Sequence, residues 1–128
     1  MLLAINFESD IPIYVQLKNQ IIQGIAMGQL KNGESLPSVR QMAGDIGINL
    51  HTVNKAYNLL KDDGFLIIDR RKGAMINISE NMSNELYINN LFEELKPIIA
   101  EAYCRGITEE EIKNYCGKIY NIYNGGKK

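Results

Sequence analysis

The segment from Leu36 to Ile78 constrains the fold most, because it combines two short helix patterns, a turn and two apolar runs. Ser38 can cap a first helix, and Gln41 has the spacing of its capping-box partner. After a Gly-containing turn, Asn49 can cap a second helix, whose apolar residues recur at helical spacing: Val53, Ala56, Tyr57 and Leu60. Two helices joined by such a turn form the unit that places its second helix in a DNA major groove. We therefore predict DNA binding.

The residues after this second helix predict a β-hairpin. Gly64 suits the left-handed position that follows a helix end. Residues 65–68 and 74–78 are short apolar runs, and the five residues between them include Arg70, Arg71 and Lys72. Three adjacent like charges repel one another unless water or phosphate screens them. A helix-turn-helix followed by a basic hairpin is a winged helix.

The remaining segments are predicted to be helical. A first helix is expected from about Asp10, with Pro12 in its first turn. The tail should hold a helix over residues 84–105, kinked or broken at Pro97, and a last helix opened by a capping box of Thr108 and Glu111. The predicted fold class is mainly α with a small β-hairpin. A winged helix-turn-helix domain with an N-terminal arm would span residues 1–78, and a short α-helical dimerisation segment residues 79–128.

The tail is rich in apolar and aromatic side chains for its size. Two helices alone cannot enclose a core, so their apolar faces must contact the winged helix, a second subunit, or both. Tyrosine combines a large contact area with a polar group and is enriched at interfaces. We expect a homodimer interface, formed by Leu91, Leu95, Tyr115, Ile119 and Tyr123. The alternative is packing onto the first helix of the same subunit.

Composition fits a small regulator. The 128-residue chain has a net charge of −1, but residues 36–78 carry six basic and four acidic side chains, a net of +2. This modest excess means that specific binding would need a dimer, which doubles the phosphate contacts. No apolar run approaches the length of a membrane span, and no secretory signal is recognisable, so we expect no membrane association and a cytoplasmic location.

No enzyme or metal site is expected from the sequence. The chain has one histidine and two cysteines, Cys104 and Cys116, without metal-ligand spacing, and it has no nucleophile elbow or phosphate-binding loop. We expect the two cysteines to be buried free thiols, and we expect no cofactor.

The stretch from Pro12 to Phe65 resembles the N-terminal domain of GntR-family bacterial transcription regulators. The matching motifs are Pro12-Ile13-Tyr14, the Gly28 and Gly33 spacing, Leu36-Pro37-Ser38 with Arg40, Thr52-Val53 and Ala56-Tyr57. With its short helical tail, the chain is similar to the YtrA-type subfamily. That resemblance implies a repressor linked to an ABC-transporter operon. It departs from the subfamily pattern at Leu50, His51 and Arg71.

The candidate DNA-binding residues come from the motif analysis and the resemblance together. They are Ser38, Arg40, Asn49, His51, Thr52, Asn54, Lys55, Arg70, Arg71, Lys72 and Gly73. Arg40 matches a DNA contact of the family, although it can instead pair with Asp45. His51 is either a base reader or an exposed capping residue, and the wing arginines can be an ordinary charged turn.

Two other function classes remain open. A winged helix can serve as a protein-interaction module that does not touch nucleic acid. A DNA-binding dimer can also be gated by an unidentified small-molecule effector in a pocket at the dimer interface, where it would favour one spacing of the winged domains.

Overall fold

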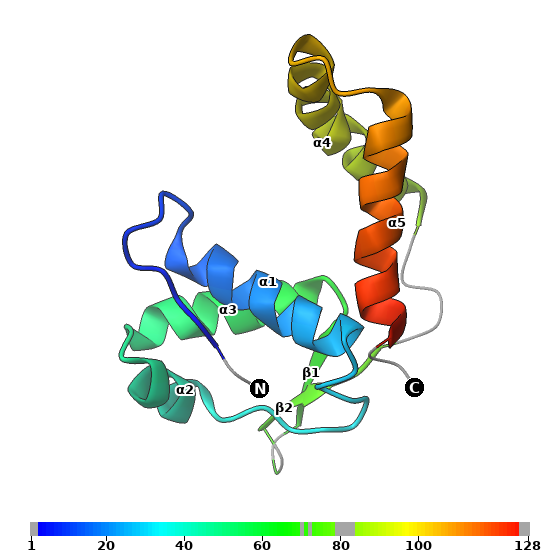
Figure 1. Ribbon diagram of the computed structural model, residues 1–128. Coiled ribbons are helices and arrows are strands. Elements are labelled where there is room, and N and C mark those ends of the chain that lie inside the picture. Colours follow the sequence, from blue (N-terminus) through cyan, green and yellow to red (C-terminus); the bar gives the residue numbers. More distant parts are fainter. Residues whose placement is uncertain (1–2, 70, 72, 79–83, 126–128) are drawn as a thin grey trace. The chain divides into compact units, whose positions relative to one another are not determined.

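The structure, a computed structural model, describes residues 3–69, 71, 73–78 and 84–125. Its elements within these ranges are α1 (Ile13–Ala26), α2 (Val39–Ile46), α3 (Leu50–Asp62), β1 (Leu66–Asp69), β2 (Gly73–Ile76), α4 (Glu85–Cys104) and α5 (Glu109–Gly125) (Figure 1). The chain divides into two compact units, and the boundary between them follows Ile78. The predicted fold class, mainly helical with one small hairpin, is confirmed.

The predicted caps define the helix-turn-helix. The backbone N–H of Gln41 donates to Ser38 Oγ at 3.0 Å, and the N–H of His51 donates to Asn49 Oδ1 at 2.7 Å. These bonds satisfy N–H groups that the first turn of a helix leaves without partners. Gly47 ends α2 with a φ of +78°, a left-handed conformation that glycine adopts without a steric penalty. Both helices therefore begin at the residues that the sequence indicates.

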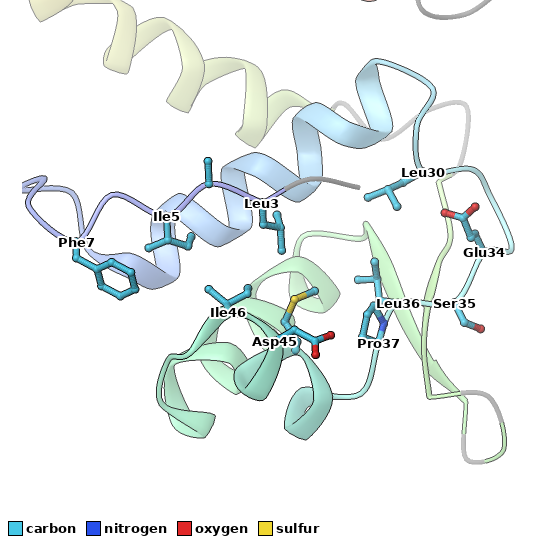
Figure 2. Close-up of a pocket in the computed structure, with 12 residues that line it drawn as sticks. Leu3, Ile5, Phe7, Leu30, Glu34, Ser35, Leu36, Pro37, Asp45 and Ile46 are labelled. Atoms are coloured by element: carbon cyan, nitrogen blue, oxygen red, sulfur yellow. The ribbon is translucent and has the colours of Figure 1, made fainter.

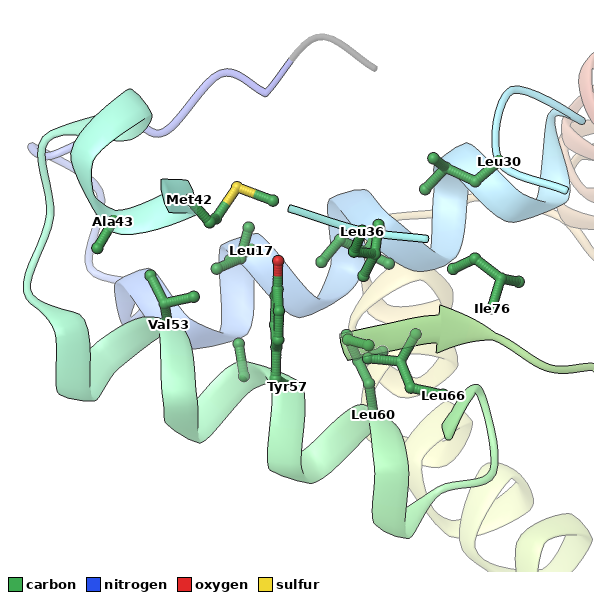
Figure 3. Packing of buried hydrophobic residues seen from close by; sticks show 13 residues of the cluster. Leu17, Leu30, Leu36, Met42, Ala43, Val53, Tyr57, Leu60, Leu66 and Ile76 are labelled. Carbon is green, nitrogen blue, oxygen red and sulfur yellow. The ribbon is translucent and has the colours of Figure 1, made fainter. Parts of the chain in front are cut away.

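The core belongs to the first unit. All buried apolar side chains of the described residues lie between Leu17 and Ile76. The four predicted residues of the second helix are among them, and Figure 3 shows Val53, Tyr57 and Leu60 of α3 directed into this cluster. The cluster consists of Leu17, Ile21, Leu30, Leu36, Met42, Ala43, Val53, Ala56, Tyr57, Leu60, Leu66, Ala74 and Ile76.

The start of α1 differs from the prediction. The helix begins at Ile13 rather than near Asp10, and Pro12 is its N-cap, with an extended ψ of 143°. The residue before a proline is itself driven away from helical conformation, so the helix cannot extend backwards through Ile11. The N-terminal arm is instead held by side chains of α1: Gln20 exchanges two hydrogen bonds with the backbone of Ala4, at 2.8 and 2.7 Å.

The hairpin reaches one residue further towards its tip on each strand than predicted. Strands β1 and β2 pair antiparallel, with Leu66 opposite Ile76 and Asp69 opposite Gly73. The segment before α2 adds further bonds to β2: Ser35 forms an isolated antiparallel bridge with Met75, and Leu36 N–H donates to the carbonyl of Ala74 at 2.8 Å. An isolated two-stranded hairpin is only marginally stable, so this segment and the core contacts of Leu66 support the wing.

The tail contains two helices, as predicted, but α4 is not broken. It runs without interruption through Pro97. Proline removes one N–H from the helix, and because α4 is exposed, water can satisfy the carbonyl left without a partner. The predicted capping box is confirmed: the N–H of Glu111 donates to Thr108 Oγ1 at 3.1 Å, and Thr108 N–H donates to Glu111 Oε1 at 3.5 Å.

The tail helices have no buried residue within this chain. Cys104 and Cys116 are both exposed free thiols, so the expectation of buried thiols is wrong. That expectation rested on the general tendency of free cysteines to be buried, whereas the two tail helices pack little against each other. Among the described residues, no helix is both long and apolar enough to cross a membrane.

Candidate nucleic-acid interface

Helix α3 presents a polar face opposite its buried stripe. Its exposed side chains include His51, Asn54, Lys55 and Asn58, while Thr52 is half-buried. All have hydrogen-bonding groups, and Asn, Lys and His can reach base edges or phosphates from a helix lying in a major groove. The structure thus brings most of the predicted reading residues to one accessible face.

A buried tyrosine fixes α3 against the segment that leads into α2. Tyr57 is 2% exposed, and its hydroxyl donates to the carbonyl oxygen of Pro37 at 2.7 Å. Burial raises the pKa of Tyr57, so the hydroxyl stays protonated and remains a donor at neutral pH. Because Pro37 directly precedes the α2 cap Ser38, this bond sets the position of α2 relative to α3.

Replacing Tyr57 with Phe should lower the free energy of unfolding by about 1–2 kcal/mol, because the Pro37 carbonyl loses its donor while the ring keeps its packing. Thermal denaturation of the variant measures this loss. Tyr14→Phe is the matched control, since the Tyr14 hydroxyl forms no hydrogen bond with any described residue and the Tyr14 ring is only half-buried. Equal melting temperatures for the two variants would show that the Tyr57 bond does not contribute to stability.

The capping residues retain donors after capping. Ser38 accepts a bond from Gln41 N–H, which leaves its hydroxyl hydrogen available. Asn49 accepts through Oδ1, which leaves its side-chain NH2 group available. Both residues are exposed at the starts of neighbouring helices, where N–H groups and helix dipoles favour anions such as phosphate.

Arg40 is exposed near the start of α2 and forms no ion pair with Asp45. Asp45 instead lines a hollow of about 630 Å³ between the N-terminal arm, residues 30–37 and α2 (Figure 2). The alternative in which Arg40 is held by Asp45 is therefore wrong, and the Arg40 guanidinium is accessible to a partner.

Lys55 makes a contact that the sequence did not predict. Its Nζ lies 4.0 Å from the centroid of the Tyr14 ring on α1, in a cation–π arrangement. Lys55 nevertheless remains exposed. The contact restrains a long side chain that would otherwise sample many rotamers, and it holds the charge beside the junction of α1 and α3.

Only part of the predicted wing is described. Arg71 is exposed, and its backbone N–H donates to Asp69 Oδ1 at 2.7 Å. Gly73 has a φ of +75°, and a Cβ added there would meet no atom within 4 Å. Backbone conformation, rather than close packing, therefore explains this glycine. Arg70 and Lys72 lie outside the described residues.

The predicted interface residues of the tail are accessible in the single chain. Leu91, Leu95, Tyr115 and Ile119 are each at least 40% exposed, and Tyr123 is half-buried.

Sequence reasoning missed two residues near the candidate interface. Asn58 lies one helical turn after Asn54 on the same exposed face, and this spacing alone could have identified it. Tyr14 was noted in the Pro12-Ile13-Tyr14 motif, but not as a partner of Lys55. Its contact with Lys55 joins two distant segments, and no local pattern signals it.

Comparison with known proteins agrees with this architecture. Residues 13–76 match the model of bacterial regulatory proteins of the gntR family. The HTH-type transcriptional repressor YtrA of Bacillus subtilis is 35% identical over 130 residues, covering 99% of this chain and 98% of that protein. A transcriptional antiterminator structure from Listeria monocytogenes EGD-e has 30% identity and a TM-score of 0.87, covering 96% of this chain and 93% of that one. YtrA from Sulfolobus acidocaldarius, a GntR-family transcription factor, has 38% identity and a TM-score of 0.64, with coverage of 78% and 99%. The chain therefore belongs to the GntR family of bacterial regulatory proteins.

Proposed function

We propose that this protein is a transcriptional repressor that binds a near-palindromic DNA operator as a homodimer. The observation that carries the proposal is the exposed polar face of α3, which two capped helices and the Tyr57–Pro37 bond hold in place. In a dimer, the two α3 helices would enter major grooves about 34–36 Å apart. The repressor relative YtrA, matched over nearly its whole length, supports the direction of regulation.

The charge distribution supports DNA as the partner. Arg40, Lys55 and Arg71 are exposed, and none of them forms an ion pair with another described residue. The three ion pairs found among the described residues all lie in the tail. Cations without acidic partners are suited to phosphates, and dimerisation doubles their number on one duplex.

The tail supports the homodimer. The exposed large apolar and aromatic side chains of α4 and α5 are Leu86, Tyr87, Ile88, Leu91, Phe92, Leu95, Ile98, Ile99, Tyr103, Tyr115, Ile119, Tyr120 and Ile122. Soluble monomers rarely expose so extensive an apolar surface. A second copy of the same helices is a partner that is always available and gives the two-fold symmetry of a palindrome.

The subfamily resemblance points to an ABC-transporter operon as the target. The protein would act on DNA in the cytoplasm. The operator can be obtained by enriching bound duplexes from a random library. Two inverted half-sites should emerge, and these duplexes serve the experiments below.

Replacing Asn54 or Arg40 with Ala should relax discrimination among operator variants. Each substitution should cost about 1–3 kcal/mol on the preferred base pair, if the side chain contacts a base edge. Lys55→Ala should instead weaken binding to all duplexes. It should also lower the magnitude of the slope of log affinity against log salt concentration by about one unit. Fluorescence anisotropy titrations on single-base variants measure both effects. Asn19→Ala, an exposed position on α1, is the matched control. Unchanged base preferences in Asn54→Ala and Arg40→Ala would remove both residues from the reading surface.

A further inference from the structure

Asn32 lies between α1 and α2, and its side chain bonds to Ile78, the last residue of the winged domain. Its side-chain Nδ2 donates to the carbonyl oxygen of Ile78 at 3.0 Å, and its Oδ1 accepts from the backbone N–H of Ile78 at 2.6 Å. One amide side chain thus satisfies both polar groups of a residue 46 positions away. This pairing reproduces the exchange of two hydrogen bonds between paired residues of an antiparallel sheet.

The Asn32–Ile78 pair extends an existing set of backbone bonds. Ile76 N–H donates to the carbonyl of Glu34 at 2.9 Å, and Asn77 N–H donates to the carbonyl of Phe65 at 3.0 Å. Residues 76–78 are therefore held from two sides, by the segment before α2 and by Phe65 in the turn between α3 and β1. The contacts end where the chain passes from the first compact unit to the second.

We propose that Asn32 is a positioning residue, which fixes the point where the chain leaves the winged domain and thereby sets the half-site spacing that the dimer accepts. The inference rests on the proposed function, because spacing has meaning only for two linked DNA-binding domains. The benefit of linking them depends on the length and stiffness of the connection. Releasing Ile78 would add unrestrained backbone in each protomer, and the dimer would lose preference for one spacing.

If Asn32 only stabilised the fold, its removal would change the half-site and full-site affinities in a different way. Asn32 is exposed and its side chain is not part of the hydrophobic core. Its hydrogen bonds compete with water, so their removal should leave the helix-turn-helix folded and able to bind a single half-site. A residue that merely supported the fold would lower half-site and full-site affinity by the same factor.

The experiment compares the full-length wild-type protein with Asn32→Ala, Asn32→Asp and the matched control Asn19→Ala. Asn32→Asp retains an acceptor for Ile78 N–H but loses the donor to the Ile78 carbonyl. Three duplexes are titrated: the selected operator, the same operator with two base pairs inserted between half-sites, and a single half-site. Thermal denaturation and amide hydrogen exchange at Ile78 are measured without DNA.

We expect Asn32→Ala to reduce the preference for the native spacing by about threefold to tenfold, with half-site affinity unchanged. Asn32→Asp should lie between Asn32→Ala and wild type, and Ile78 exchange should be faster in Asn32→Ala. A wild-type spacing preference in Asn32→Ala would overturn the proposal, as would equal losses on the half-site and the operator. The proposal would also be overturned if the Ile78 amide exchanged at the same rate in Asn32→Ala and in the wild-type protein, both measured without DNA. If the wild-type protein enriches no duplex, the proposed function is contradicted, and the proposed spacing role with it. The hydrogen-exchange measurement needs no DNA, so it would still test the Asn32–Ile78 pair in that case.

Discussion

Replacing Ile119 with Asp should convert the protein from a dimer to a monomer and abolish tight operator binding. Ile119 is 50% exposed in the single chain and shares a face of α5 with Tyr115 and Tyr123. If a second subunit covers this face, an aspartate there is either buried as an unpaired charge or neutralised by a raised pKa, and both outcomes weaken association. Operator affinity should fall by roughly 100-fold or more, because the half-sites are no longer linked.

The matched control for this substitution is Asn114→Asp, which places the same carboxylate on the opposite side of α5. Light scattering, helical circular dichroism and operator titration should be measured on both variants. Both should remain helical, and only the Ile119 variant should become monomeric. A folded, dimeric Ile119→Asp protein with wild-type operator affinity would exclude this face as the dimer interface.

Replacing Leu60 with Ala should destabilise the winged domain by about 2–5 kcal/mol, a large share of the stability of so small a domain. Leu60 of α3 is fully buried and lies in the cluster with Leu17 and Leu66. Alanine is a good helix former, so the loss would come from the cavity rather than from helix propensity. Leu59→Ala is the control, since Leu59 is half-buried and does not belong to that core cluster.

Thermal denaturation followed by circular dichroism tests this prediction. The Leu60 variant should melt well below the Leu59 variant, and it should lose operator binding at temperatures where the Leu59 variant still binds. Equal melting temperatures would mean that the cluster around Leu60 does not hold α3 in place.

Features determined by neighbouring residues could be predicted from the sequence. The caps at Ser38, Asn49 and Thr108 follow from residue types within one helical turn, and the structure places all three as predicted. The buried stripe of α3 follows from helical periodicity in the same way. Local patterns were therefore sufficient for the helix-turn-helix and for the polar face that it presents.

Features that depend on distant segments or on a partner could not be predicted. No periodic pattern in the sequence predicts the Lys55–Tyr14 contact or the Asn32–Ile78 pair, because each joins residues that only the folded chain brings together. Exposure of Cys104 in the tail was mispredicted for a related reason: a helix pattern shows which face is apolar, but not what covers it. Pro97 was expected to kink or break α4. The helix is not broken, because water can solvate the carbonyl that loses its N–H partner in an exposed helix.

The most direct test of DNA recognition is a titration of wild-type protein against the enriched duplex and a scrambled duplex of the same composition, at several salt concentrations. We expect two chains to bind each enriched duplex, about 1,000-fold or more tightly than the scrambled one. The affinity for both duplexes should fall as salt rises. Equal affinity for the two duplexes, or no salt-dependent binding to either, would contradict sequence-specific DNA binding. It would favour a winged helix that binds another protein.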